Sequence, residues 1–179
     1  DLKYAASDAI KIYQLLTNPN IGGFDKHHLY FLTDIPQGKL PPGIQAEQPT
    51  RTNIIKKLYS IQTIPAPPDT VFIYFSGHGI QEGGESYLLP IDTGLEILKE
   101  TAISLQYVVE KIDESKARAK IFIMDACRSE VKRDKSASGA MSEEFVRALF
   151  HNVVGRGILS STDAGQVSYE SDELRQGVF

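Results

Sequence analysis

Two reactive side chains each follow an apolar run of the sequence. His78 lies in "VFIYFSGHGIQ", residues 71–81, and Cys127 lies in "IFIMDACRSE", residues 121–130. A cysteine becomes a nucleophile when a nearby base or positive charge favours its thiolate. Histidine suits the role of that base because its pKa lies near neutrality. The two residue types therefore predict nucleophilic catalysis, provided that the fold brings them together.

Small residues surround both side chains. Gly77 and Gly79 are expected to let the backbone turn sharply and approach a substrate. The backbone N–H groups of Gly79 and Cys127 are then candidate donors to a developing oxyanion. Taken alone, a cysteine at a strand end is most often an inert thiol, and a Gly-His-Gly sequence is most often a turn. Their occurrence at the ends of two similar strands favours catalysis.

The elements that must position these residues follow from the pattern of apolar positions. Helical spacing predicts four helices, at Ala5–Thr17, from Thr50 or Thr52 through Ile61, from Ser104 through Ile112, and at 142–153. Continuous apolar runs predict two buried strands, at Val71–Phe75 and Ile121–Met124. Shorter strands are expected at 28–34, at 86–92 and within 155–163, and loops at 34–50 and 128–139.

Strands that alternate with helices predict an α/β fold with a mostly parallel central sheet and helices on both faces. Ligands of such sheets bind outside the carboxyl ends of the strands. His78 and Cys127 each follow a predicted strand by two or three residues. Neighbouring strands would therefore bring both to one rim. No repeat or linker divides the 179 residues, which predicts a single domain over residues 1–179.

Composition excludes several classes of function. A formal net charge of -4 argues against nucleic acid as a partner. No apolar run approaches the roughly 18 residues of a membrane span, and no signal peptide is visible, although the chain begins at Asp1 rather than methionine. The single cysteine suits a reducing compartment, so a cytoplasmic location is expected. No metal site is predicted, and adjacent His27 and His28 are expected to be structural or surface residues.

The two motifs resemble those of the caspase-like cysteine peptidases. "SGHG" and "DACRS" each follow an apolar strand, and "DAC" is similar to the metacaspase and bacterial orthocaspase type. The similarity runs from "DLKYAASDA" to "QGVF", with an N-terminal strand and the C-terminal end of the family domain expected to be missing. The resemblance implies a caspase-like fold with Cys127 as nucleophile and His78 as acid or base. It also implies an oxyanion hole formed by the amides of Gly79 and Cys127.

The resemblance further implies where a substrate is cut. Metacaspases prefer arginine or lysine before the scissile bond and line the pocket for that side chain with two aspartates and a serine. The matching positions are Asp8, Asp125 and Ser76, and the position of a caspase pocket arginine falls on Glu170. Carboxylates pair with a guanidinium in forked hydrogen bonds and repel an aspartate side chain. We therefore expect protein or peptide substrates cut after Arg, with Lys second.

Three further expectations complete the interpretation. Residues 128–138 allow two interpretations, a solvated charge run or a site of self-cleavage, and their basic residues are Arg128, Lys132, Arg133 and Lys135. Self-cleavage would make the chain's own C-terminal fragment a partner. No cofactor is expected, calcium included, because the loop after the histidine motif carries only Glu82 and Glu85. The alternatives are a pseudo-enzyme or interaction module of the same fold, and a related peptidase with different specificity.

Overall fold

The computed structural model describes residues 4–128, 156–160, 169–171 and 176–178. Its helices are α1 (Ala5–Thr17), α2 (Arg51–Thr63), α3 (Leu98–Thr101) and α4 (Leu105–Glu114), with 3-10 helices η1 (Lys26–His28), η2 (Gln37–Lys39) and η3 (Leu95–Ile97). Its strands are β1 (Thr70–Glu82), β2 (Glu85–Leu88), β3 (Ile103–Ser104), β4 (Ala119–Arg128), β5 (Arg156–Ser160), β6 (Tyr169–Ser171) and β7 (Gln176–Val178). The helix predicted at 142–153 lies outside the described residues.

Five strands form the main sheet in the order β3-β2-β1-β4-β5, and β6 pairs with β7 in a separate sheet. β1, β4 and β5 are parallel, whereas β2 and β3 join antiparallel. The α/β class is confirmed, but the sheet is mixed rather than mostly parallel. The reason is a tight turn at Gly83 and Gly84, whose φ angles of 61° and 84° fold β2 directly back onto β1.

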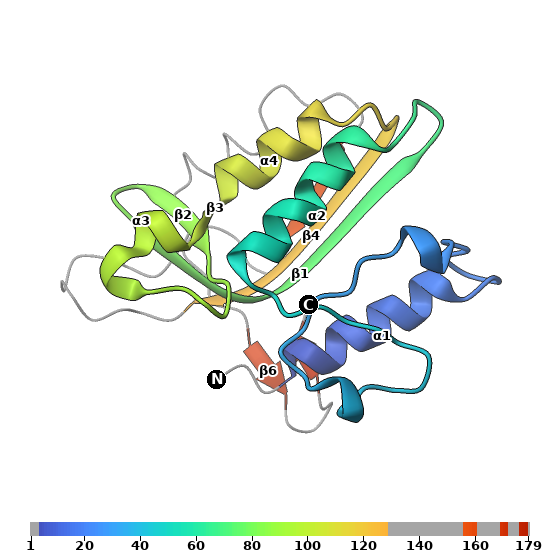
Figure 1. Cartoon of the computed structure of the whole chain (residues 1–179), viewed down its shortest axis with the longest axis horizontal. Coiled ribbons are helices and arrows are strands. Elements are labelled where there is room, and N and C mark those ends of the chain that lie inside the picture. The colour runs from blue at the N-terminus through green and yellow to red at the C-terminus, as the bar shows by residue number, and fades with distance from the viewer. Residues whose placement is uncertain (1–3, 129–155, 161–168, 172–175, 179) are drawn as a thin grey trace.

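One face of the sheet packs against α2 and α4, which Figure 1 shows side by side along the sheet. The predicted inner face of α4 is confirmed, since Leu105, Val108, Val109 and Ile112 are all buried. They form one cluster with Leu58 of α2 and with Phe122 and Met124 of β4. Burial of each such side chain contributes about 1.5–3 kcal/mol, so this cluster holds the central strands in place.

The opposite face of the sheet meets α1. Successive strand residues alternate between faces, and Ile73 and Phe75 pack on the cluster that α2 and α4 form. Phe72 and Tyr74 therefore lie on the other face. There the ring of Phe72 contacts the ring of Phe24, which follows α1, with 6.4 Å between centroids. Helices thus cover the central strands on both faces, as the sequence predicts.

The central strands extend further than predicted. β1 continues to Glu82 and β4 to Arg128, so His78 and Cys127 lie within their strands rather than beyond them. The sharp turn expected at Gly77 and Gly79 is absent, because both continue β1 and neither has a positive φ. Position 77 instead needs glycine for space, since a Cβ there would lie 2.8 Å from the ring of Phe75.

The strand predicted at residues 28–34 is wrong. His28 ends η1, and Leu32 forms an isolated parallel bridge with Glu47. The N–H of Thr33 donates to the carbonyl of Glu47, and the N–H of Glu47 donates to the carbonyl of Phe31, each at 3.0 Å. The segment therefore pairs with the predicted loop at 34–50 and not with the main sheet.

Candidate active site

His78 and Cys127 are direct Cα partners in the parallel ladder between β1 and β4. Neighbouring strands lie about 4.8 Å apart, and partners in register occupy the same face of a sheet. Both positions are near the carboxyl ends of their strands, where ligands of α/β proteins bind. The fold thus brings the two positions together, as the sequence predicts. The catalytic roles of the two residues stay a prediction, since the structure describes only the backbone of Cys127.

The backbone around His78 is held from both sides. The N–H of Leu89 donates to the carbonyl oxygen of His78 at 3.0 Å. Gly79 is the Cα partner of Leu88 on one side and of Arg128 on the other. These backbone pairings fix the strand that carries the imidazole of His78, a half-buried residue. The donation of the Gly79 and Cys127 amides to an oxyanion stays a prediction.

A polar pair lies on the same face, one row inside the pair of His78 and Cys127. Ser76 and Asp125 are Cα partners, and two residues along a strand span about 7 Å. Asp125 is only 6% exposed. A buried carboxylate needs hydrogen-bond or charge partners.

Tyr74 continues this face toward the middle of the sheet. Burial raises the pKa of its phenol to about 12, and the carboxylates of Asp125 and Asp8 add to the rise, whereas a side-chain hydrogen bond with Ser76 opposes it. One phenol therefore senses all three residues that the sequence assigns to the specificity pocket. Ser76 and Asp125 are partners on this face, and α1, which carries Asp8, contacts β1.

Asp8 reaches this group from α1. Its side chain is 14% exposed, and its Oδ1 accepts a hydrogen bond from Nζ of Lys11 at 3.3 Å. The side chain of Lys11 is 51% exposed. A cation of the chain itself thus adjoins the acidic group. Neither Lys11 nor Tyr74 is singled out by the sequence motifs, although helical i,i+3 spacing and strand alternation point to them.

The remaining predicted residues lie at the margins of the site. Glu170 is in β6, where its Cα partner is Gly177 of β7. β7 contacts α1, so the hairpin that carries Glu170 lies beside the helix that carries Asp8. Arg128 ends β4. The other residues predicted for self-cleavage lie outside the described residues: Lys132, Arg133 and Lys135.

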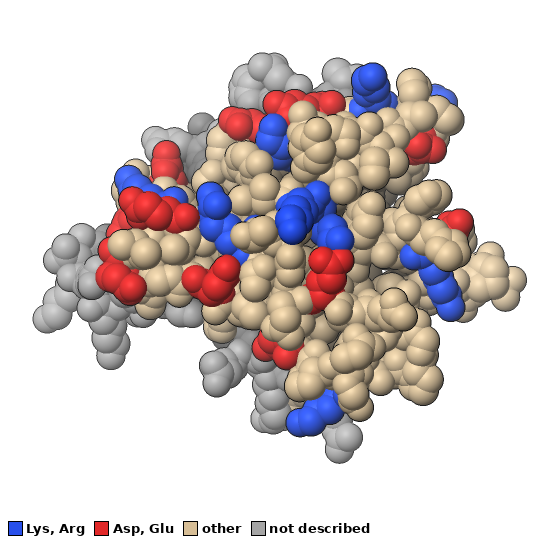
Figure 2. All heavy atoms as spheres, viewed as in Figure 1, with Lys and Arg blue, Asp and Glu red and all other residues tan. Residues whose placement is uncertain are grey.

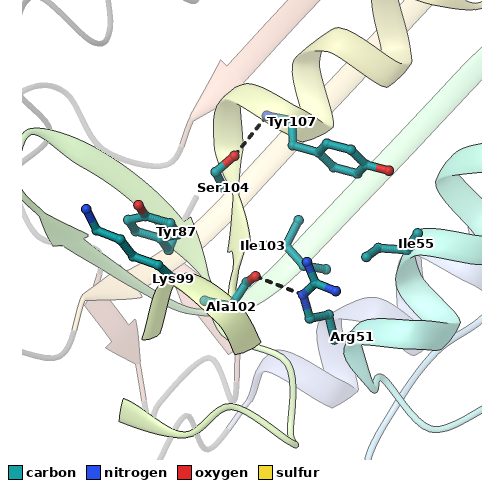
Figure 3. Close-up of a pocket in the computed structure, with 8 residues that line it drawn as sticks. All are labelled: Arg51, Ile55, Tyr87, Lys99, Ala102, Ile103, Ser104 and Tyr107. Atoms are coloured by element: carbon teal, nitrogen blue, oxygen red, sulfur yellow. Dashed lines mark hydrogen bonds between the residues drawn. The ribbon is translucent and has the colours of Figure 1, made fainter. Parts of the chain in front are cut away.

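A cavity of about 200 Å³ lies apart from this group. Figure 3 shows its eight lining residues, which are Arg51, Ile55, Tyr87, Lys99, Ala102, Ile103, Ser104 and Tyr107. Nε of Arg51 donates to the carbonyl of Ala102 at 3.2 Å, and Oγ of Ser104 accepts from the N–H of Tyr107 at 3.1 Å. This cavity contains none of the predicted site residues and no thiol or imidazole, so it is not the candidate reaction centre.

Charge is mixed on the face drawn in Figure 2, where basic and acidic side chains are interspersed. Lys57 pairs with Glu47, and Lys111 pairs with Glu114 at 2.6 Å. This face does not present the single-signed basic surface that nucleic acid needs.

Within the described ranges, no helix has the length and apolar character to cross a membrane. In the same part of the chain, no group of three or more His, Cys, Asp or Glu residues could hold a metal ion.

Known proteins share features of this chain. A family model for the caspase domain matches residues 1–179. A probable protease from a Desulfuromonadales bacterium is 30% identical over 136 residues, which cover 72% of this chain and 16% of that protein. Mucosa-associated lymphoid tissue lymphoma translocation protein 1 from Homo sapiens is 27% identical over 107 residues, 60% of this chain and 12% of that protein. The matched part of the chain therefore covers less than one fifth of the length of each of these relatives.

Proposed function

The chain belongs to the caspase-domain family of cysteine peptidases, and from this premise we propose that it is an endopeptidase that cuts after arginine and, second, after lysine. The family match confirms the resemblance carried by the two motifs. One observation supports the specificity: the carboxylates of Asp125 and Asp8 both act on the phenol of Tyr74, on the sheet face that also carries His78 and Cys127. Two carboxylates favour a guanidinium or ammonium and repel a substrate aspartate.

In the proposed reaction, the Cys127 thiolate attacks the carbonyl carbon of the scissile peptide bond. The N–H groups of Gly79 and Cys127 stabilise the oxyanion that forms. Protonated His78 then gives its proton to the leaving amine as the C–N bond breaks, which leaves a thioester on Cys127. Water attacks the thioester while His78 takes a proton from it. The acid product leaves, and the thiolate–imidazolium pair is restored.

The substrate lies extended along the rim of the sheet, where main-chain hydrogen bonds orient it. Its basic side chain enters between α1 and the central strands. The row of Ser76 and Asp125 lies about 7 Å from the catalytic row, a distance that arginine and lysine span and short side chains do not. Glu170 belongs to β6, whose partner strand β7 contacts α1, and we propose that it adds negative charge to the pocket.

Self-cleavage is a second part of the proposal. A basic-specific peptidase with Arg128, Lys132, Arg133 and Lys135 after its nucleophile carries suitable bonds of its own. Intact-mass measurement of the purified chain and of Cys127→Ala, under conditions of turnover, tests this. Fragments that end in Arg or Lys within 128–138, seen only with Cys127 present, are expected. One intact mass in both proteins would exclude self-cleavage.

We further propose that the enzyme is of the metacaspase and orthocaspase type, works in the cytoplasm and needs no calcium. A hard cation wants six or more oxygen ligands, whereas the hairpin after His78 supplies Glu82 and Glu85 as its acids. Turnover should therefore be unchanged by a chelator. Loss of activity on chelation, restored by calcium, would contradict this part alone.

Hydrolysis of matched fluorogenic peptides tests the proposed function. The peptides differ only in Arg, Lys or Asp before the leaving group, and Cys127→Ala is the control. Turnover after Arg and Lys, absent in the control, is expected. Cleavage after Asp would overturn the specificity and leave the family assignment intact. No turnover, together with a thiol that resists iodoacetamide at neutral pH, would favour an interaction module.

A further inference from the structure

A phenol lies at the inner end of the acidic group. Tyr74 precedes Ser76 by two residues and His78 by four, and strand alternation puts all three on one face of β1. Across the ladder, Ser76 faces Asp125, whereas Tyr74 faces Ile123. Tyr74 thus stands where the polar part of this face meets its apolar part. A side chain that enters from the catalytic row reaches the tyrosine last.

The phenol oxygen lies among polar groups from three elements. Its side chain hydrogen bonds with that of Ser76, and it interacts with Asp125 of β4 and Asp8 of α1. Its pKa, raised to about 12 mainly by burial, keeps the group neutral and protonated at any physiological pH. A neutral phenol gives one O–H donor and also accepts hydrogen bonds. It can therefore donate to a neighbouring oxygen and still accept a hydrogen bond from a bound cation.

We propose that Tyr74 is a further specificity-determining residue, whose hydroxyl oxygen accepts a hydrogen bond from the guanidinium of a substrate arginine and so favours arginine over lysine. This inference rests on the proposed cleavage after basic residues. It adds to the carboxylates a neutral acceptor that no family motif assigns.

Lysine and arginine side chains differ in the number and arrangement of the hydrogen-bond acceptors that they require. A lysine ammonium has three donors on one nitrogen, whereas an arginine guanidinium spreads five donors over a planar fork. One oxygen of Asp8 already accepts from Lys11, which leaves fewer acidic acceptors for the substrate. Lysine needs fewer acceptors than arginine does. Because the side chain of Tyr74 hydrogen bonds with that of Ser76, its oxygen adds one acceptor beside the row that the guanidinium reaches.

The change Tyr74→Phe tests this, because it removes the hydroxyl and keeps the ring. We expect kcat/KM for the Arg peptide to fall about tenfold through KM, and kcat/KM for the Lys peptide to change less than about twofold. The matched control is Tyr107→Phe, which removes the hydroxyl of another half-buried tyrosine, on α4. The ratio of the two kcat/KM values is independent of the active fraction, so partial misfolding does not disturb it.

The outcomes separate this inference from the proposed function. A fall in the Arg-to-Lys ratio in Tyr74→Phe, with Tyr107→Phe unchanged, supports the role of the hydroxyl. An unchanged ratio in Tyr74→Phe, in an enzyme that cuts after both residues, overturns the inference and leaves the proposed function standing. A wild-type enzyme that cuts after neither Arg nor Lys overturns both.

Discussion

Ser76 and Asp125 are Cα partners in the ladder between β1 and β4, one row inside His78 and Cys127 on the same face of the sheet. The register that aligns the two reactive positions also aligns the serine and the buried acid behind them. Because β1 and β4 are parallel and continuous through both rows, the proposed reaction and the proposed specificity depend on a single strand pairing. A shift of β4 by one residue against β1 would turn Asp125 and Cys127 to the other face, away from Ser76 and His78.

Removal of the buried carboxylate should impair recognition of basic substrates. For Asp125→Asn we expect kcat/KM on the Arg peptide to fall about 30-fold or more, because loss of one partner in a desolvated ion pair typically costs 2–5 kcal/mol. Asp8→Asn, on α1 rather than on the strand of the nucleophile, should raise KM with little change in kcat. The control is Glu114→Gln, an exposed acid on α4. Wild-type KM values in both pocket variants would contradict the proposed pocket.

Replacement of the competing cation should have the opposite effect. Lys11 pairs with Asp8 at 3.3 Å and is half exposed, so a substrate guanidinium must share that carboxylate. Exposed pairs of this kind contribute about 0.2–1 kcal/mol. We therefore expect Lys11→Met to lower KM for the Arg peptide by about two- to threefold. Lys26→Met, at an exposed lysine of η1, is the control. A higher KM would show that Lys11 organises Asp8 instead of competing for it.

The cluster between α2, α4 and the sheet should dominate stability. Phe122 is 1% exposed, and Phe→Ala changes in cores cost about 3–5 kcal/mol. We expect Phe122→Ala to lower the free energy of unfolding by this amount in urea titrations followed by circular dichroism. Tyr59→Ala removes an aromatic ring from a residue that is 63% exposed, and it should cost far less. Equal losses in the two variants would refute the assigned core.

Alkaline stability reports on the environment of Tyr74. Its pKa is raised from 10.0 to about 12 in the folded protein. Between these values the unfolded chain loses the proton first, so the free energy of unfolding falls as pH rises. A full shift of this size corresponds to about 2.7 kcal/mol. Because Tyr74 is only half-buried and solvent screens it, we expect about 1 kcal/mol at pH 11.

The measurement compares urea titrations at pH 8 and pH 11. Tyr74→Phe lacks this ionisation, so its stability should fall by about 1 kcal/mol less than that of wild type between the two pH values. The same fall in both proteins would mean that the phenol is not buried as described.

The sequence pattern predicts the helices, in which apolar residues recur at regular spacing. α1 spans the predicted Ala5–Thr17, and α4 follows its predicted cap at Ser104, whose Oγ accepts from the N–H of Tyr107. Thr50, one of two predicted caps, begins α2 in the same way. α2 and α4 begin at capping side chains, whereas α1 has no side-chain cap, and the spacing of apolar residues indicates the inner face of α4.

Features that depend on pairing between distant segments could not be predicted in the same way. Residues 28–34 have strand-like composition, but Leu32 is bridged to Glu47 rather than added to the sheet. The apolar runs predict ends of β1 and β4 that come too early in the chain. Each strand continues past its apolar run because the neighbouring strand supplies hydrogen bonds there. Tyr74 resembles any apolar strand residue in sequence. Only the pairing of β1 with β4 and the approach of α1 to β1 give it the acidic neighbours Asp125 and Asp8.

Covalent labelling of Cys127 by peptidyl chloromethyl ketones tests the central claim most directly. Two reagents of equal length, one ending in Arg and one in Asp, are incubated with the protein, and the modified residue is located by mass spectrometry. We expect the Arg reagent to alkylate Cys127 rapidly and the Asp reagent to react far more slowly, with the Arg preference lost in Asp125→Asn. Equal rates for the two reagents, or no modification of Cys127 by either, would contradict a basic-specific cysteine peptidase.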